Sequence, residues 1–381
     1  MTQEMPIPEL AEAERLAEAG KFVDAELAFA RAIRAPQATS AMVKYGDFLK
    51  RVGRIGEALE MYQQVLRGSE SEPDEIAAVA HRKVGEIYWM RGNPVDAHEH
   101  YRKALAIDKK LNIEIALADD YRALGRLAQE RGEFEAAEGY FARALELDTR
   151  VRSERGMAKD KRNLGLLRLE RGHLDEAKAL FEAAIEINQR HDWKDGIAKD
   201  SGNLALVLQK RGDWKVAAEM QAKALQLQQE LEDTEGAADS CGNLGIIHLE
   251  LGQLSKAELY LEKALRLDEQ LGRLPGIARA SVYLADVYSR KGEYDIAESS
   301  IRKAISLYER LKDRRGLAGA YRVLGNVYEN RHDLESARSM RVFAADLYRQ
   351  MGDDAGKREM ERFLVESPQQ LIEGRSTNPT G

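Results

Sequence analysis

The sequence predicts an all-α protein built from stacked helix pairs, and three observations carry this prediction. The 381 residues include only eight prolines, about 2% against a usual share of roughly 5%, and none lies between Pro94 and Pro275. Glycine, with 30 residues, is not scarce, which fits helices that end at glycine. Small residues also recur with a 40-residue period. Because a single core rarely exceeds about 250–300 residues, the length implies two domains or an elongated repeat architecture.

Three columns of small residues carry the period, and together with their shorter-spaced N-terminal extensions they hold 20 of the 30 glycines. The first column is Gly85, Gly125, Gly165, Ala205, Gly245, Ala285 and Gly325. The second, seven residues later, is Gly92, Gly132, Gly172, Gly212, Gly252 and Gly292, with His332 in the next place. The third is Gly156, Gly196, Gly236, Gly276, Gly316 and Gly356. Gly46 with Gly53 and Ala13 with Gly20 extend the first two columns.

Each period divides into a helix, a turn and a second helix. Around Gly165 the apolar residues from Gly156 to Arg171 have helical spacing, and Arg171-Gly172 supplies a basic last turn and a left-handed end. The second helix is expected from Leu174 to about Arg190. A column of alanines in this helix predicts a close crossing of two helices, since only a methyl group fits there. Its members are Ala25, Ala58, Ala97, Ala137, Ala177, Ala217, Ala257, Ala297 and Ala337.

The ends of the chain differ from the repeats. Residues 1–7 are expected to form an N-terminal tail, and the helix pairs to run from residue 8 to 355, with the 40-residue period from residue 85 on. Residues 356–366 fit one amphipathic helix with Met360, Phe363 and Leu364 on its apolar face, which indicates a cap on the last repeat. Residues 367–381 are polar and are expected to be disordered.

The order of small residue, glycine, alanine, aromatic residue and small residue resembles the tetratricopeptide repeat over about residues 8–366. The 40-residue form is similar to that of kinesin light chain and the Pins/LGN-type adaptors, including Asn163-Leu164-Gly165. The resemblance implies a right-handed α-solenoid of about nine helix-turn-helix units plus the C-terminal capping helix. The family's usual aromatic residue is replaced at four places, which predicts looser or more aliphatic packing there: Gln221, Leu261, Ile301 and Arg341.

Composition excludes several classes of function. The net charge of −7 argues against a nucleic-acid or anionic-membrane partner. A single cysteine, Cys241, excludes an intramolecular disulfide and a cysteine-rich metal site, and we expect it to be buried. The chain has no apolar stretch long enough to span a membrane as a helix and no leader-like start, so we expect a cytoplasmic protein.

Searches for catalytic patterns return nothing, so we expect no enzyme, no cofactor and no metal. The chain has no phosphate-binding loop and no serine elbow. His98 and His100 are two residues apart, which puts them on different faces of a helix. Asp120, Asp160 and Asp200 recur at the spacing of the repeat, and the favourable field at a helix start is a sufficient structural reason.

The resemblance implies that ligands bind the concave face, which the first helix of each pair lines. Basic residues on this face favour a protein or peptide partner with acidic or carboxylate groups, since a concave wall focuses potential. The alternative is that these charges are merely solvated. The candidate peptide-binding residues are Arg82, Trp89, Arg122, Arg126, Lys159, Arg162, Asn163, Lys199, Asn203, Asn243, Arg279 and Tyr283.

The asparagines at 163, 203 and 243 form a ladder with the same 40-residue spacing. Asparagine is unfavourable in the middle of a helix, so the ladder needs a reason. Its amide can both donate to and accept from a peptide backbone, which suits gripping of an extended segment. The alternative is a hydrogen bond between neighbouring repeats.

These features together indicate a non-enzymatic scaffold or adaptor that binds an extended or helical peptide of a partner protein. One alternative is a peptide-sensing regulator, like bacterial quorum-signal receptors with similar long repeats. Those usually carry an N-terminal effector domain, whereas the repeats here start by about residue 8. Another is a self-assembling scaffold; the polar cap instead favours a monomer or a weak homo-oligomer.

Overall fold

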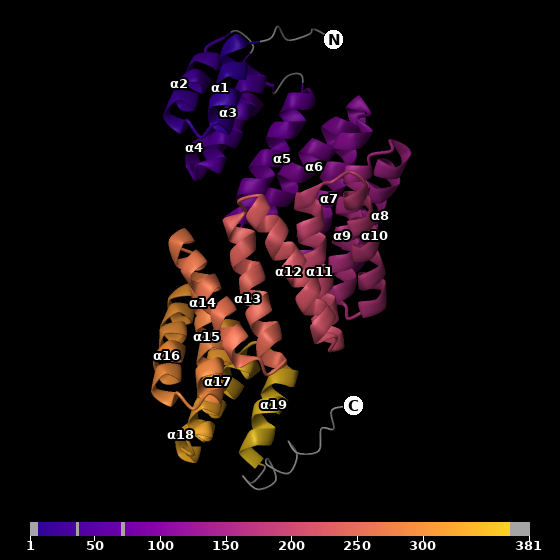
Figure 1. The fold of residues 1–381 in the computed structure, drawn as a ribbon. Helices are drawn as coiled ribbons and strands as arrows, with labels where there is room; N and C mark the ends of the chain where they lie inside the picture. The colour runs from indigo at the N-terminus through magenta and orange to yellow at the C-terminus, as the bar shows by residue number, and fades with distance from the viewer. Residues whose placement is uncertain (1–6, 36–37, 70–72, 366–381) are drawn as a thin grey trace. The chain divides into compact units, whose positions relative to one another are not determined.

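The computed structural model describes residues 7–35, 38–69 and 73–365, which form nineteen helices and no strand (Figure 1). Predicted features in residues 1–6 and 366–381 therefore lie outside the described residues. The first ten helices are α1 (Pro8–Glu18), α2 (Phe22–Ala32), α3 (Thr39–Arg51), α4 (Ile55–Gly68), α5 (Glu75–Met90), α6 (Pro94–Leu111), α7 (Glu114–Glu130), α8 (Phe134–Arg150), α9 (Glu154–Glu170) and α10 (Leu174–Arg190). The others are α11 (Lys194–Arg211), α12 (Trp214–Glu230), α13 (Thr234–Glu250), α14 (Leu254–Leu271), α15 (Leu274–Arg290), α16 (Tyr294–Leu311), α17 (Arg314–Asn330), α18 (Leu334–Gln350) and α19 (Asp354–Val365).

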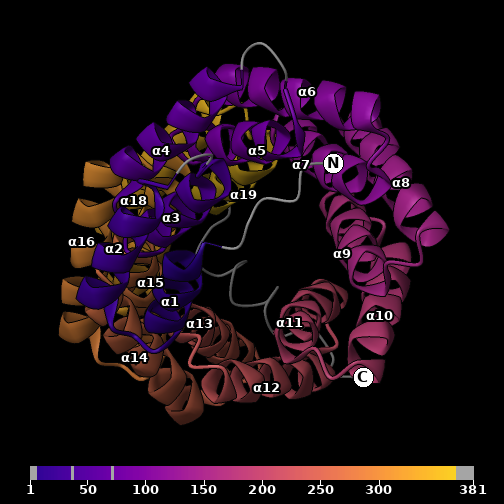
Figure 2. The same cartoon turned by 90° about the horizontal axis from the view of Figure 1, so that it is seen from above.

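The chain divides into two compact units, residues 1–187 and 188–381, which are described separately. In the first unit α5, α7 and α9 form one layer, and α6 and α8 form the other (Figure 2). In the second unit α11, α13 and α15 share one layer, and α12, α14 and α16 the other. We call the face of the odd-numbered helices that points away from the even-numbered ones the inner face. The all-α solenoid of nine helix pairs and one closing helix is confirmed.

The first helices of the pairs end in the predicted left-handed residue. Gly172 has φ +80°, and the other glycines of its column have φ between +69° and +83°. His332, which replaces the glycine in the last pair, keeps φ +68° although a side chain makes this conformation less favourable. The turn geometry therefore holds even where glycine is lost.

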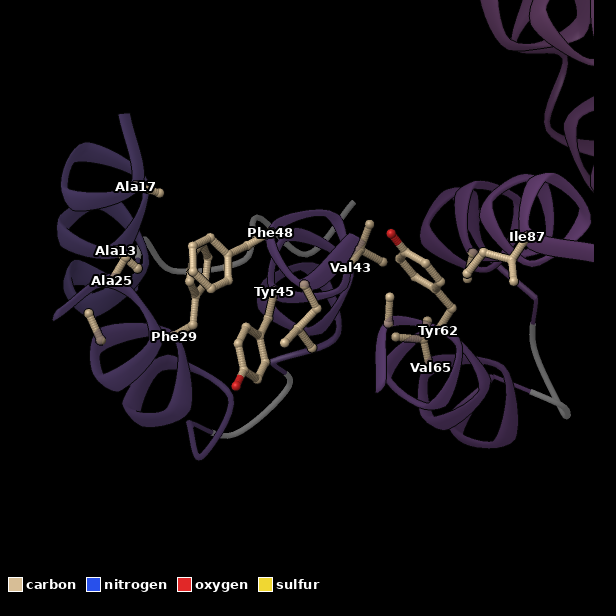
Figure 3. Close-up of a cluster of buried hydrophobic side chains, with 14 of the residues drawn as sticks. Ala13, Ala17, Ala25, Phe29, Val43, Tyr45, Phe48, Tyr62, Val65 and Ile87 are labelled. Carbon is tan, nitrogen blue, oxygen red and sulfur yellow. The ribbon is translucent and has the colours of Figure 1, made fainter. Parts of the chain in front are cut away.

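A buried ring of the second helix explains the first column of small residues. An added Cβ on Gly125 would lie 2.5 Å from Cε1 of Phe141, and one on Gly165 would lie 2.8 Å from Cε1 of Phe181. Both rings are fully buried. Figure 3 shows Tyr62, an N-terminal member of the same aromatic column, packed near Val65 and Ile87. Each ring thus occupies the volume that a side chain on the facing helix would need.

The third column of small residues lies where one pair meets the next. Gly156, at the start of α9, packs against the carboxylate of Asp148 near the end of α8. Gly276 meets Asp268 in the same way, and Gly316 meets the ring of Tyr308. These contacts set how far each pair is shifted along its neighbour.

Where the aromatic column lapses, packing does not loosen. Leu261 and Ile301 are fully buried, which confirms the more aliphatic packing. Gln221 is also buried and donates to Ser240 over 2.7 Å. Arg341 is 4% exposed, pairs with Glu329 at 2.7 Å and lies over the Phe363 ring of the capping helix. The expectation of looser or more aliphatic packing is thus met by the aliphatic packing of Leu261 and Ile301, whereas Gln221 and Arg341 have polar partners but keep one buried atom each, Oε1 and Nε, without a hydrogen bond among the described residues.

We predict that Gly125→Ala lowers the free energy of unfolding by about 2 kcal/mol, because the new methyl group and the Phe141 ring cannot occupy the same place. Gly139→Ala in the adjacent α8 is the matched control. Nothing lies within 4 Å of its new methyl group, so higher helix propensity should stabilise the protein by up to about 1 kcal/mol. Urea unfolding of both variants measures the difference, and equal stabilisation would refute the proposed packing constraint.

Candidate functional site

The inner face of the first unit contains a cleft of about 520 Å³ between α5, α7 and α9, with Tyr101 of α6 at its base. Six of the predicted site residues come together here: Arg82, Arg122, Arg126, Lys159, Arg162 and Asn163. Lys83, Glu86, Asp119, Tyr101 and Ala123 complete its lining. The repeat explains the grouping, since positions one period apart fall on equivalent places of successive first helices.

Two of the six arginine and lysine side chains that line the cleft, Arg82 and Arg122, are paired with buried aspartates. Arg122 is only 7% exposed, and its guanidinium group donates to Asp148, to Asp160 over 3.0 Å and to Asp119. Because Asp148 and Asp160 are fully buried, this group ties α7 to α8 and α9. The burial changes the role of Arg122 from the predicted ligand contact to a support between repeats.

The preceding repeat has the same arrangement. Arg82 of α5 donates to Asp108 of α6 and to Asp120 of α7, the latter over 3.1 Å, and both aspartates are fully buried. The helix-field explanation for Asp120 and Asp160 is therefore wrong, since each lies in the second turn or beyond and pairs with an arginine of the previous repeat. The sequence did carry a signal, because the arginines and aspartates recur with the same 40-residue period.

Each of these clusters holds two buried carboxylates against one guanidinium group. Burial raises the pKa of Asp120 to about 8 and that of Asp160 to about 7, although the adjacent arginines act to lower both. One oxygen of each buried aspartate in the clusters has no hydrogen-bond partner in the described structure. The carboxyl groups of Asp120 and Asp160 therefore hold their protons to higher pH than an exposed aspartate does.

In the second unit, two of the repeats place amides and hydroxyls at the equivalent position. The side chain of Asn188 donates to buried Asp200 over 2.8 Å, and Asn188 stands in the column of Asp108 and Asp148. One repeat later, Ser240 lies between Gln221 and Gln228 and is hydrogen-bonded to both. The same place in the fold thus takes either a charged or a neutral polar set.

Three other side chains of the cleft, Lys159, Asn163 and Arg126, have no aspartate partner of the kind that Arg82 and Arg122 have. Lys159 is exposed and forms no ion pair within the described part of the chain. Asn163 is half-buried, and its amide has no hydrogen bond among the described residues. Arg126 is exposed and lies 5.3 Å from the centre of the Trp89 ring, while the indole N–H of Trp89 donates to Glu130. Trp89 therefore orients a guanidinium group that has no carboxylate partner in the described chain.

The remaining predicted site residues belong to the second unit. Lys199 is exposed, and Asn203 and Asn243 are half-buried without a hydrogen bond to any described residue. The hydrogen bond between neighbouring repeats, weighed as the alternative for the asparagine ladder, is not formed by its members in the described structure. Arg279 pairs with Asp239 at 3.2 Å and lies near Tyr283, so its charge is compensated.

The side chains considered for chemistry do not form a reactive centre. Cys241 is fully buried, and burial raises the pKa of its thiol to about 11. His100 faces His81 with 2.9 Å between their Nδ1 atoms rather than pairing with His98. Among the described residues no three His, Cys, Asp or Glu side chains gather as metal ligands. In the same residues no helix has both the length and the apolar character needed to cross a membrane.

Helix pairs stacked in chain order define a helical-repeat protein. The sequence profile described as tetratricopeptide repeat matches residues 37–110, 115–190, 198–270 and 276–350. The chain belongs to the tetratricopeptide repeat family. No curated protein sequence matches it significantly.

Three solved structures resemble the chain along most of its length. A Rap protein complexed with competence and sporulation factor shares 16% identity over 88% of this chain and 98% of its own, with a TM-score of 0.58. The apo quorum sensor NprR from B. thuringiensis shares 17% identity over 89% and 97%, with a TM-score of 0.62. Aspartyl phosphate phosphatase F from Bacillus subtilis shares 12% identity over 91% and 96%, with a TM-score of 0.61. At these identities the likeness concerns the fold.

The raised pKa of Asp120 predicts a pH-dependent stability. The pKa of Asp120 is raised from its usual 3.8 to about 8 in the folded chain, so folding retains a proton that the unfolded chain loses. The free energy of unfolding should fall as pH rises through this window and level off above about pH 8. In Asp120→Asn this loss is absent, and Arg82 keeps Asp108 as a partner. Between pH 6 and 9 the variant should lose about 2–3 kcal/mol less than the wild type.

Urea unfolding at several pH values provides the measurement. Glu182→Gln, which neutralises an exposed acid on α10, is the control and should leave the wild-type slope unchanged. An Asp120→Asn protein with the wild-type slope would show that the pKa of Asp120 is not raised in the folded chain.

Proposed function

We propose that this chain is a non-enzymatic interaction protein that binds a peptide segment of a partner, with carboxylate groups, on its inner face. The observation that carries the proposal is the set Arg126, Lys159 and Asn163. These groups share one cleft, and none has an acidic or hydrogen-bonding side-chain partner in the described chain. A peptide could supply both kinds of partner, carboxylates from its side chains or terminus and carbonyl and N–H groups from its backbone.

The buried arginine–aspartate clusters determine which of the basic side chains in the cleft are available to a ligand. Because Arg82 and Arg122 are matched by aspartates beneath the cleft, they contribute little unbalanced charge to its surface. Lys159 and Arg126 remain available to a ligand, and the cleft walls reduce the screening that solvent would give. Charge-assisted hydrogen bonds from these two side chains to a carboxylate are stronger than neutral ones.

The asparagines support a backbone contact in both units. Each of Asn163, Asn203 and Asn243 has an unused donor and acceptor at a half-buried place, where leaving them unpaired costs free energy. A peptide backbone would satisfy both groups of an amide whatever its sequence. Such contacts suit a partner recognised by an extended main chain, with specificity from the charged groups.

A peptide-sensing regulator is the second candidate. It is favoured by the solved structures of similar fold, two of which are a quorum sensor and a Rap protein complexed with competence and sporulation factor. The two candidates differ in the form of the ligand. An adaptor binds a segment within a partner protein, whereas a peptide sensor binds a free peptide and changes its affinity for another protein.

We predict that peptides selected from a random display library on the wild-type chain are enriched in Asp and Glu, and that Lys159→Glu binds them at least tenfold more weakly. Fluorescence anisotropy with a labelled selected peptide measures the affinity. Lys178→Glu, on the outer helix α10, reverses a surface charge elsewhere and should leave binding unchanged.

The asparagine contacts have their own test. Asn163→Ala should weaken the same peptide several-fold without lowering the melting temperature, because the Asn163 amide bonds to no other group within the described protein. A parallel loss of binding and melting temperature would instead mean that Asn163 holds the repeats together.

A further inference from the structure

The repeat column that contains Arg82 and Arg122 changes to glycine in the second unit. Its members are Arg82, Arg122, Arg162, Gly202, Gly242, Val282 and Arg322. Arg82 and Arg122 each donate to a buried aspartate that follows 26 residues later in the chain. Gly242 of α13 stands at the same separation before Asp268 of α14. The second unit therefore keeps the buried acid of this cluster at a place where its arginine is missing.

Asp268 has unused capacity to accept hydrogen bonds. It is only 1% exposed, and its Oδ1 atom has no hydrogen-bond partner among the described residues. Its one ion pair in the described chain joins Oδ1 to Nε of Arg273 over 3.4 Å, which is longer than a good hydrogen bond. Burial raises the pKa of Asp268, because the carboxylate has lost hydration that its neighbours do not fully replace. A directly bonded guanidinium group, as in the first unit, is what this acid lacks.

A narrow hollow lies between α13, α14 and α15 (Figure 1), and both Gly242 and Asp268 line it. Most of its other lining is apolar or aromatic: Ile246, Leu261, Ala264, Ala280 and Tyr283. Such a lining suits the methylene groups of an arginine side chain. Ala280 occupies the column of Asp120 and Asp160, so the hollow presents one carboxyl group where the first unit has two.

The hollow is too narrow for a water molecule while Arg279 lies across its entrance. Nη2 of Arg279 is 3.2 Å from the place of a Cβ added to Gly242, and it is also 3.2 Å from Oδ1 of Asp239. The Arg279 and Asp239 side chains are 38% and 45% exposed, and ion pairs of this kind contribute little to stability. Asp239 also pairs with Arg273 at 2.8 Å, so it keeps a partner when Arg279 moves. Entry into the hollow therefore requires one side-chain movement of small cost.

We propose that this hollow binds an arginine side chain of a partner protein or peptide, with its guanidinium group at Asp268 in the place that Arg82 and Arg122 take at their aspartates. The charges near Asp268 favour a cation, because three acids face two bases there. They are Glu235, Asp239 and Asp268 against Arg273 and Arg279. The inference goes beyond the proposed function, since the hollow belongs to the second unit and requires no carboxylate on the ligand.

Blocked single amino acids test the hollow without a contribution from the rest of a peptide. The probes are N-acetyl-arginine N-methylamide and its citrulline counterpart, which has a similar shape but no charge. Methyl NMR of the full chain, labelled at isoleucine and leucine, reports on the hollow through Ile246 and Leu261 in its lining. We expect saturable shifts of both signals with the arginine probe. The dissociation constant of the citrulline probe should be about tenfold larger, since hydrogen bonds between charged groups are stronger than neutral ones.

Two variants locate the binding. Gly242→Arg supplies the missing side chain from α13 itself and should abolish the probe-dependent shifts without lowering the melting temperature. Asp268→Asn removes the acid and should abolish the preference for arginine over citrulline, so one variant remains informative if the other does not fold. Gly139→Arg is the control and should bind as the wild type does. It adds the same charge at an exposed place on α8, where nothing lies within 4 Å of the added Cβ.

The outcomes are separate from those of the proposed function. The inference is overturned by the absence of a saturable shift on the wild-type chain or by equal affinities of the two probes. It is also overturned if the arginine preference survives in a folded Gly242→Arg or Asp268→Asn protein, or disappears in Gly139→Arg as well. None of these results affects the proposed carboxylate contact at Lys159, because the probes carry no carboxylate. Loss of the preference in the two hollow variants alone supports the arginine site.

Discussion

The rest of the structure depends on the contact of a buried side chain with a glycine of the facing helix. Phe141 on Gly125 and Phe181 on Gly165 are two cases, and Leu261 on Gly245 shows that the constraint concerns volume rather than aromatic character. A helix pair held this way has one arrangement, because any side chain on the glycine or any smaller group in place of the ring changes the separation of the helices. A small residue recurs at this place in every period, as glycine in most and as alanine at Ala205 and Ala285, so the inner-face positions recur as well.

The buried arginine–aspartate clusters add a second constraint to this packing. Their ionic groups gain attraction at low dielectric but lose hydration, and such pairs contribute less to stability than their geometry suggests. What they do fix is the relative position of three successive helices, since Arg82 and Arg122 each reach the next pair. They also take positive charge away from the inner face, so that the cleft is less cationic than its lining suggests.

The fold was predictable from the sequence because every level of it follows the same period. Glycine columns, the alanine column and the second helix from Leu174 to Arg190 all agree with the structure. The site was only partly predictable. A column position tells which face a residue occupies, but it does not distinguish Arg122, which is buried among aspartates, from Arg126, four residues on and exposed. The distinction depends on partners from two other helices, which reasoning on one helix cannot supply.

The column that begins with Asp108 shows why the repeats can differ in chemistry while keeping one shape. Its later members are Asp148, Asn188, Gln228, Asp268, Tyr308 and Tyr348, and those from Asp148 on pack against a glycine near the start of the next first helix. Because that glycine leaves the space, carboxylate, amide and phenol all fit. At Asp108 and Asp148 the first helix of the same pair supplies an arginine, Arg82 or Arg122, to the buried carboxylate. Variation at this buried column therefore changes the polar partners at the interface, without any change in the glycine contacts that hold the pairs.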